Sequence, residues 1–143
     1  MYAITRFKEL YQELSSLNPD DLGLLYADDV VFIDPITTHR GLTAVTQYFS
    51  ALTEHAESCQ FDIDNVIACE KNAQQITHVV TWTMTLIINK RRPTITLDGI
   101  TQLRICNDRI TYHRDYYDLG EMVYEHIPIL GWFVKKVKKR LAT

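Results

Sequence analysis

The segment Leu25-Tyr26-Ala27-Asp28-Asp29-Val30-Val31-Phe32-Ile33-Asp34-Pro35 carries the strongest fold signal in the chain. Residues 30–33 are β-branched or aromatic, which is typical of a strand. Asp34 precedes a proline, and a residue in that position prefers an extended backbone, so the strand should end there. The leucines and the tyrosine over residues 22–26 predict a short helix just before this strand.

Helical periodicity lies on both sides of this segment. Apolar residues recur at helical spacing over residues 4–17 and again over residues 42–52. Between them, Asn18-Pro19-Asp20-Asp21 suits the start of a helix, because Asn18 can cap it and Pro19 fits its first position. The sequence therefore predicts three helices in its N-terminal part.

From Cys59 onward the apolar period changes from helical spacing to two. This alternation predicts strands joined by short turns at residues 71–72, 89–93 and 107–108. The strand segments are 59–69, 77–88, 94–105 and 110–118. Helices gathered on one side of such a meander define an α+β fold. A sheet that curls around them would leave a pocket inside.

Length and composition indicate an ordinary globular domain. The chain has 143 residues, 46% of them hydrophobic and 23% charged. It contains no run of apolar residues long enough to cross a membrane and no signal-peptide core, so we expect a cytoplasmic protein. The three cysteines show neither metal-ligand spacing nor a disulfide framework, and we expect buried free thiols.

The charge distribution is uneven along the chain. Five of the 15 basic residues lie within residues 135–140, which leaves 10 basic against 18 acidic residues before them. Such an acidic body should repel nucleic acid. The tail has an apolar stripe at helical spacing: Leu130, Phe133, Val134, Val137 and Leu141. Two interpretations stay open: a helix that docks on its own domain, or weak contact with an anionic membrane surface.

Two motifs resemble one known superfamily. Residues 25–35, followed by Gly41, resemble a signature of SnoaL-like and ketosteroid isomerase-like proteins, within the nuclear transport factor 2-like superfamily. The segment 108–118 resembles the last strand of that superfamily, especially its limonene epoxide hydrolase branch. This resemblance implies a cone-shaped α+β barrel, with three N-terminal helices on a curved mixed, mostly antiparallel sheet. We place this domain at residues 1–126 and a basic C-terminal helix at 127–143.

The ketosteroid isomerase pattern is matched only in part. Its general base is an aspartate directly before proline at the end of the first strand, and Asp34 matches that position. Tyr11 lies near the place of the tyrosine that, with a protonated aspartate, forms the oxyanion hole. Thr101 stands where that aspartate would be, and its hydroxyl is a far weaker acid. The resemblance therefore disfavours steroid isomerisation.

The epoxide hydrolase pattern is matched less well. Asp115 corresponds to one aspartate of its aspartate–arginine–aspartate set. Trp82 and Met84 replace the other two members, and Phe32 and Asp34 replace an assisting tyrosine and asparagine. Because Trp and Met supply no acid–base group, epoxide hydrolysis is disfavoured as well.

The resemblance and the strand alternation together predict a largely apolar pocket with a few polar groups. Our candidate catalytic residues are Asp34, Asp115, His113 and Tyr11. Our candidate ligand-binding residues are Trp82, Met84, Thr101, Tyr117 and Phe32. We expect a small hydrophobic ligand, with cofactor-free acid–base catalysis of isomerase, cyclase or hydrolase type as one interpretation. No cofactor is expected, and no metal, since the histidines lack partners at ligand spacing.

Plainer interpretations of the same residues stay open. Asp34 could merely end a strand and cap nearby amides. His113 and Asp115 could form a polar cluster that holds the sheet to the helices, and Trp82 and Met84 could be core residues. The alternative function is a non-catalytic homodimer with a vestigial pocket, which uses outward residues such as Tyr116 for pairing.

Overall fold

The computed structural model describes residues 2–122 and 128–142. Its helices are α1 (Ala3–Tyr11), α2 (Leu42–His55), α3 (Leu119–Met122) and α4 (Pro128–Leu141), with 3-10 turns η1 (Leu14–Ser16) and η2 (Pro19–Leu24). Its strands are β1 (Tyr26–Ile33), β2 (Thr38–Arg40), β3 (Ser58–Ala68), β4 (His78–Ile87), β5 (Ile95–Cys106) and β6 (Arg109–Tyr117). The predicted meander is confirmed, and each end of β3 to β6 lies within one residue of the expected position.

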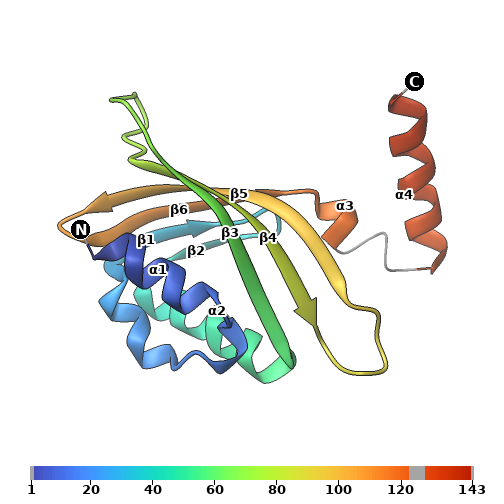
Figure 1. Cartoon of the computed structure of the whole chain (residues 1–143), viewed down its shortest axis with the longest axis horizontal. Coiled ribbons are helices and arrows are strands. Elements are labelled where there is room, and N and C mark those ends of the chain that lie inside the picture. Colours follow the sequence, from blue (N-terminus) through green and yellow to red (C-terminus); the bar gives the residue numbers. More distant parts are fainter. Residues whose placement is uncertain (1, 123–127, 143) are drawn as a thin grey trace.

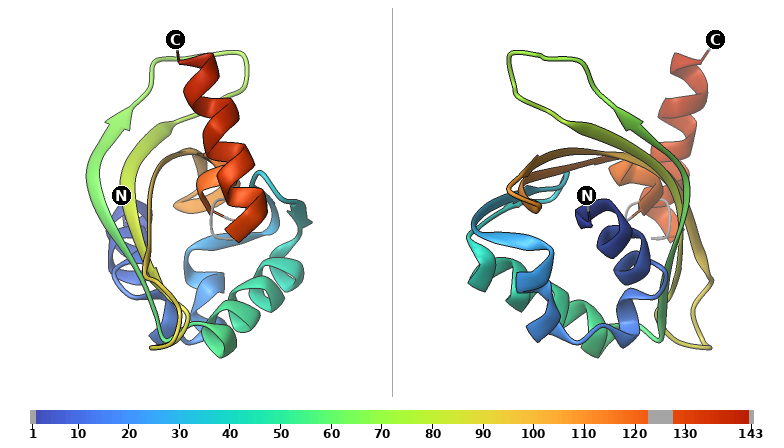
Figure 2. Two further views of the ribbon diagram at one scale, coloured as in Figure 1. Left: turned by 90° about the vertical axis from the view of Figure 1, so that its right-hand side faces the viewer. Right: turned by 60° about the vertical axis from the view of Figure 1, so that its left-hand side comes forward.

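The six strands form one curved sheet in the order β2-β1-β6-β5-β4-β3. Only β1 and β6 pair in parallel, so among the described residues the sheet is mixed and mostly antiparallel, as predicted. Register shifts between Ile63 and Asn65 and between Arg104 and Ile105 add to the bend. The sheet curves around α1 and α2, which lie in its hollow (Figures 1 and 2). The α+β fold is therefore confirmed.

One hydrophobic core fills the space between the helices and the inner face of the sheet. Phe7 and Tyr11 of α1 and Val45 and Phe49 of α2 are all less than 5% exposed. They meet alternate residues of the strands, which point inward as a period of two requires. The buried strand residues include Tyr26, Phe32, Cys59, Val80, Trp82, Met84, Leu97, Leu103 and His113.

The first helix is shorter than predicted, because Glu13 interrupts it. The backbone of Glu13 is extended (φ −150°, ψ 92°). Its carboxylate accepts hydrogen bonds from Ser58 Oγ (2.6 Å), Cys59 N (2.8 Å) and Ser15 Oγ (2.7 Å). Burial alone would raise the pKa of Glu13, but these bonds outweigh it and lower the pKa to about 2. Glu13 therefore ties the end of the first helical segment to the start of β3.

Two other local predictions were wrong in detail. The second helix is the 3-10 turn η2, and Tyr26 belongs to β1 instead. The sequence predicted no strand between residues 35 and 42, but Thr38–Arg40 form β2, which pairs with β1 before Gly41 (φ 87°). Only glycine adopts that backbone conformation readily, so β2 can lead directly into α2.

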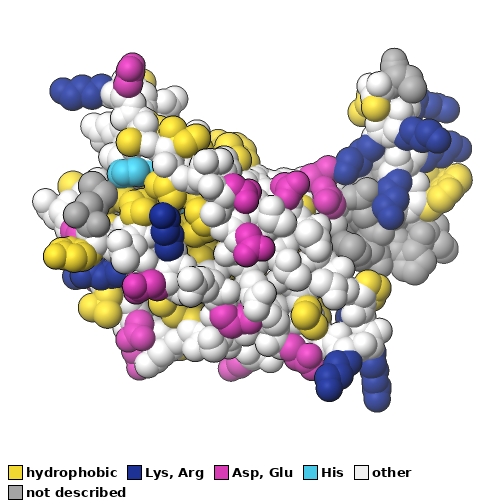
Figure 3. Space-filling view, in the orientation of Figure 1, with side chains coloured by type: hydrophobic (Ala, Val, Ile, Leu, Met, Phe, Trp, Pro, Cys, Tyr) yellow, Lys and Arg dark blue, Asp and Glu magenta, His cyan; other side chains and the backbone are white. Residues whose placement is uncertain are grey.

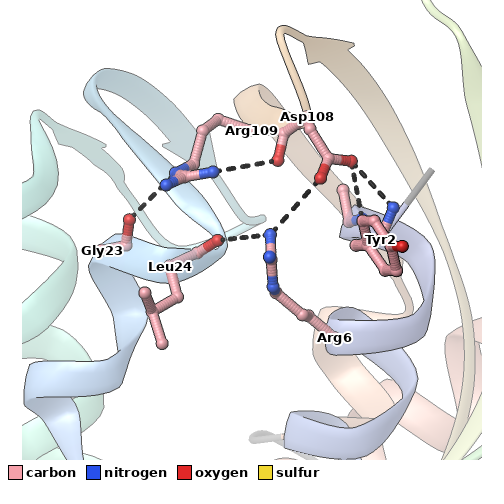
Figure 4. A network of polar contacts seen from close by, with 7 residues as sticks. Tyr2, Arg6, Gly23, Leu24, Asp108 and Arg109 are labelled. Atoms are coloured by element: carbon pink, nitrogen blue, oxygen red, sulfur yellow. Dashed lines mark hydrogen bonds and ion pairs between the residues drawn. The ribbon is translucent and has the colours of Figure 1, made fainter.

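The hairpin between β5 and β6 anchors the N-terminus of α1 (Figure 4). Asn107 and Asp108 both have positive φ (51° and 59°), as a two-residue hairpin turn requires. Asp108 Oδ1 accepts hydrogen bonds from the backbone N–H groups of Tyr2 (3.0 Å) and Ala3 (2.9 Å). These bonds, together with Arg6 beside Asp108 Oδ2, lower the pKa of Asp108. The predicted turn therefore also positions the first helix.

The cysteines differ from expectation, and the described C-terminal residues form helices. The three thiols are free, but only Cys59 is buried, and Cys106 is exposed. The short helix α3 follows β6, and residues 123–127 lie outside the described residues. Helix α4 begins at Pro128 and runs through Gly131 to Leu141. None of the helices described is long and apolar enough to span a membrane.

Gly99 allows a test of how tightly side chains pack on the inner face of the sheet. It pairs with Trp82 across β4 and β5, and a Cβ atom added to it would lie 2.5 Å from Trp82 Cζ2. Because Trp82 is only 3% exposed, its ring has little room to move. We expect Gly99→Ala to lower the free energy of unfolding by about 1–3 kcal/mol, measured by urea denaturation.

Gly23→Ala is the matched control. A Cβ there would meet Leu42 Cδ2 at 3.5 Å, which is an ordinary van der Waals distance. Its stability should equal that of the wild type or exceed it slightly. Equal stabilities for the two variants would contradict the tight placement of the Trp82 ring.

Candidate functional site

A chain of hydrogen bonds begins in helix α1 and crosses the core to the last strand. The hydroxyls of Tyr11 and Tyr26 lie 2.6 Å apart. Tyr26 Oη lies 3.0 Å from His113 Nδ1, and His113 Nε2 lies 2.7 Å from Asp115 Oδ1. The strand alternation had placed His113 and Asp115 on one face, and the structure brings their side chains into direct contact.

The chain of hydrogen bonds continues from Asp115 into the neighbouring strands. Thr101 Oγ1 of β5 donates to Asp115 Oδ1 at 2.6 Å. Trp82 Nε1 of β4 donates in turn to Thr101 Oγ1 at 2.8 Å. Asp115 Oδ1 thus receives two hydrogen bonds, one from His113 and one from Thr101. Among the described residues, Asp115 Oδ2 receives none.

The donors in this chain can all point toward Asp115. A carboxylate only accepts, so His113 Nε2 carries the proton and donates to it. When His113 Nδ1 accepts a hydrogen bond from Tyr26, the Tyr26 oxygen is left to accept one from Tyr11. In this arrangement each hydroxyl donates one hydrogen bond, and every donor of the hydrogen-bond chain has an acceptor.

Aromatic packing fixes the ring of His113. This side chain is fully buried, and its ring stacks on Phe32 with centroids 4.0 Å apart and an interplanar angle of 17°. Tyr11 and Phe7 lie beyond it, with centroids 6.2 Å and 6.1 Å away. The parallel register pairs Phe32 with His113, which explains the stack. The imidazole therefore has little freedom to reorient.

A small cavity of about 60 Å³ lies beside Asp115. Aromatic and aliphatic side chains from α1, α2, α3 and the sheet surround it, including Phe32, Met84 and Met122. Tyr11, Tyr48 and Asp115 bring oxygen atoms to this lining, and Asp115 is its sole carboxylate among the described residues. The volume corresponds to about two water molecules, at about 30 Å³ each.

Two tyrosines near this carboxylate remain protonated far above neutral pH. Burial raises the pKa of Tyr48 well above its ordinary value, and the negative charges of Asp115 and Asp34 raise it further. Burial, Asp34 and Asp115 raise the pKa of Tyr117 in the same way. Both carboxylates therefore lie within electrostatic reach of the same two phenols. Each phenol can act as a hydrogen-bond donor.

Asp34 holds a turn beside this group. Its Oδ1 atom accepts hydrogen bonds from the backbone N–H groups of Ile36 (2.8 Å) and Thr37 (2.9 Å). The side chain is mostly buried, with the residue 7% exposed, but it is not part of the cavity lining. This geometry agrees with the plainer interpretation, in which the aspartate before Pro35 caps nearby amides.

A model of the SnoaL-like domain matches residues 7–113, about three quarters of the chain. The chain belongs to the SnoaL-like domain family. No curated protein matches the sequence of this SnoaL-like domain.

Solved structures with low sequence identity share the fold. A hypothetical protein from Catenulispora acidiphila with a ketosteroid isomerase-like fold, in complex with trimethylamine, is 21% identical, with a TM-score of 0.69 over 87% of this chain and 90% of that one. An LEH-like epoxide hydrolase from M. tuberculosis is 18% identical, with a TM-score of 0.69 over 94% and 93%. A putative SnoaL-like polyketide cyclase from Jannaschia is 13% identical, with a TM-score of 0.65 over 82% and 83%.

The candidate residues of this SnoaL-like domain fall into three groups. The hydrogen-bond chain joins Tyr11, His113, Asp115, Thr101 and Trp82. Phe32 and Met84 line the cavity, whereas Asp34 and Tyr117 lie outside its lining. Within the described residues, no cluster of His, Cys, Asp and Glu is suited to hold a metal ion.

Sequence reasoning missed two tyrosines of the site. Tyr26 links Tyr11 to His113, and Tyr48 lines the cavity. Tyr26 had a usable signal, because it lies in the motif 25–35 at the start of a strand beside the last one. Tyr48 looked like any other apolar position of the stripe over 42–52, so no signal in the sequence distinguished it.

The direction of the hydrogen-bond chain can be tested with two hydroxyl deletions. Tyr26→Phe would leave buried His113 Nδ1 without a donor, whereas Tyr11→Phe removes only the last donor of the chain. We expect Tyr26→Phe to lower the free energy of unfolding by about 2–3 kcal/mol and Tyr11→Phe by about 1 kcal/mol or less. Urea denaturation measures both. A larger cost for Tyr11→Phe would contradict the donor assignment.

Proposed function

We propose that this SnoaL-like domain binds a small, mainly apolar molecule in the cavity beside Asp115, and that Asp115 transfers a proton to or from it without a cofactor. The observation that carries this proposal is the state of one carboxylate. Oδ1 of Asp115 is held by His113 and Thr101, and Oδ2 has no hydrogen bond among the described residues. A base that is fixed through one oxygen and available through the other suits general acid–base catalysis.

Tyr48 is the proposed partner of Asp115 in this reaction. Its hydroxyl forms no hydrogen bond within the described residues, and its raised pKa keeps the proton on the oxygen. In our scheme, Asp115 removes a proton from a carbon next to a carbonyl group. The electron pair moves onto the carbonyl oxygen, which accepts a hydrogen bond from Tyr48. Return of the proton to the substrate completes the cycle.

This scheme changes two roles that the sequence had suggested. Tyr11 lines the cavity, but its hydroxyl is engaged with Tyr26, so in this scheme Tyr11 holds Tyr26 in place and does not stabilise the substrate oxygen. Oδ1 of Asp34 caps the turn after β1, so we assign the base role to Asp115. Asp34 would act through its negative charge, which helps to keep Tyr48 protonated.

The cavity limits the size of the proposed ligand. About 60 Å³ is far below the roughly 300 Å³ or more of drug-sized ligand pockets, so only a few non-hydrogen atoms fit without rearrangement. Met84 and Met122 are unbranched and flexible, and their movement would enlarge the space. The structurally similar protein from Catenulispora acidiphila is in complex with trimethylamine, which has only four non-hydrogen atoms.

Proton exchange gives a direct test of the base. In D2O, small ketones and lactones should incorporate deuterium next to the carbonyl group faster with the protein than without it, as followed by NMR. Asp115→Asn keeps an oxygen that can accept from Thr101 but is no longer basic. We expect it to slow the catalysed exchange by about 10²-fold or more. Tyr48→Phe should slow it as well, by removing the donor to the substrate oxygen.

Asp62→Asn is the control for this experiment. Asp62 is an exposed aspartate of β3, and its replacement removes the same charge from a residue that belongs neither to the chain of hydrogen bonds nor to the cavity lining. The exchange rate should not change. If Asp115→Asn catalyses exchange as fast as Asp62→Asn, the assignment of the base is wrong. If no compound in the panel exchanges or raises the melting temperature, the ligand proposal fails.

A second candidate function is pairing of two copies through the outer face of the sheet. Ile100 and Tyr116 are partners in adjacent strands, and they are 38% and 40% exposed. Arg114 lies over the ring of Tyr116, with its Cζ atom 4.8 Å from the centroid. An apolar pair with a stacked arginine is the composition that buried protein interfaces favour. In this candidate, the small cavity is a remnant without a ligand.

Light scattering distinguishes the second candidate. If the outer face pairs, the wild type should have twice the mass of the 16.6 kDa chain, and Ile100→Lys should be monomeric. Ile67→Lys is the control, because Ile67 is 51% exposed on β3 at the edge of the sheet. A monomeric wild type would rule out this candidate and leave the ligand proposal intact.

A further inference from the structure

We propose that α4 binds the surface of an anionic lipid bilayer, with its apolar stripe in the interface and its basic side chains toward the lipid headgroups. This inference concerns the outside of the molecule and does not depend on the proposed function of the cavity. It rests on the exposure, the spacing and the charge of the described side chains of α4.

The apolar stripe of α4 is exposed to solvent. Phe133, Val137 and Leu141 are spaced four residues apart, which places them on one face of the helix. They are 53%, 56% and 81% exposed, so the helix does not bury this face against its own domain. Large apolar side chains that stay exposed along one face indicate a contact that lies outside the chain.

The remaining faces of α4 are strongly basic. Lys135, Lys136, Lys138, Lys139 and Arg140 lie within its last seven residues. In Figure 3 the basic side chains gather on α4, whereas acidic side chains lie on the neighbouring part of the domain. Within this set, Lys138 forms an ion pair with Asp118, at the end of β6. Both partners are about 40% exposed, so this contact holds the helix only weakly.

A lipid surface matches this combination better than other anionic partners do. The chain before residue 135 has 10 basic and 18 acidic residues, and this excess of negative charge opposes wrapping by a nucleic acid. Nucleic acid would also leave the apolar stripe in water. An anionic bilayer offers both a negative surface and an apolar layer beneath it, which is what a basic amphipathic helix requires.

The arrangement of the molecule allows such a contact. Helix α4 stands apart from α1 and α2, on the side of the sheet where α3 lies (Figures 1 and 2). The helix can therefore lie on a surface while the acidic domain stays away from it. The overall charge of −3 gives the whole protein no general attraction to anionic lipid, so binding would depend on α4.

Flotation of the full-length protein with vesicles tests the proposal. We expect binding to vesicles that contain phosphatidylglycerol and much weaker binding to pure phosphatidylcholine. Raising the salt from about 0.1 to about 1 M shortens the Debye length from about 10 to about 3 Å, and it should release most of the protein. Binding that is equal for both lipids, or absent from both, would overturn the proposal.

Two pairs of variants show whether lipid binding depends on α4 or on other parts of the surface. The double variant Lys135→Glu with Lys139→Glu should weaken binding about tenfold or more. Its control is Lys71→Glu with Lys90→Glu, which changes the net charge equally at exposed sites elsewhere and should have little effect. Phe133→Ser with Val137→Ser should also release the protein. Ile36→Ser with Ile67→Ser is its control, at 62% and 51% exposure. Equal effects within either pair would contradict binding through α4.

Two further outcomes would assign the stripe to another partner. If light scattering shows self-association that the Phe133→Ser and Val137→Ser variant abolishes, and vesicles do not bind, the stripe covers a second copy of the chain. If duplex DNA binds and anionic vesicles do not, the basic residues serve a nucleic acid. Either result would replace the lipid proposal.

Discussion

The parallel pairing of β1 with β6 is the constraint on which the rest of the structure depends. The other ladders join strands that follow one another in the chain, whereas this one joins residues about eighty positions apart. It places Phe32 beside His113 and brings Tyr26 within reach of the same ring. A shift of the register by one residue would turn His113 and Asp115 to the outer face, because side chains alternate along a strand. The site therefore exists only when this long-range pairing has formed.

The buried hydrogen bonds make this pairing more specific than apolar packing alone would. Apolar side chains tolerate small displacements, but a buried imidazole must find a partner for each nitrogen. Here those partners come from different strands, Tyr26 from β1 and Asp115 from β6. Thr101 and Trp82 then extend the contact into β5 and β4. This chain of hydrogen bonds therefore requires that four strands are in the correct register and that α1 is correctly placed.

The sequence predicted what depends on local pattern and missed what depends on register. The period of two placed β3 to β6 correctly, and the turn at residues 107–108 was predicted because Asn and Asp tolerate positive φ. The early end of α1 was not predictable, because it depends on the contact of Glu13 with β3. Spacing within one strand grouped His113 with Asp115. The bond from Trp82 to Thr101 could not be foreseen in the same way, since it requires the alignment of two strands.

The cavity and α4 are close along the polypeptide chain, so the cavity must lie near any surface that α4 binds. Met122 lines the cavity, and α4 begins six residues later at Pro128. Six residues span about 20 Å at most, even when fully extended. A helix that lay on a bilayer would therefore keep the cavity within that distance of the lipid. A mainly apolar ligand that partitions into the bilayer would reach Asp115 over a short path, and apolar molecules are concentrated in lipid for the same reason that they enter an apolar cavity. The same hydrophobic effect would thus favour both the contact of α4 with lipid and the entry of an apolar ligand into the cavity.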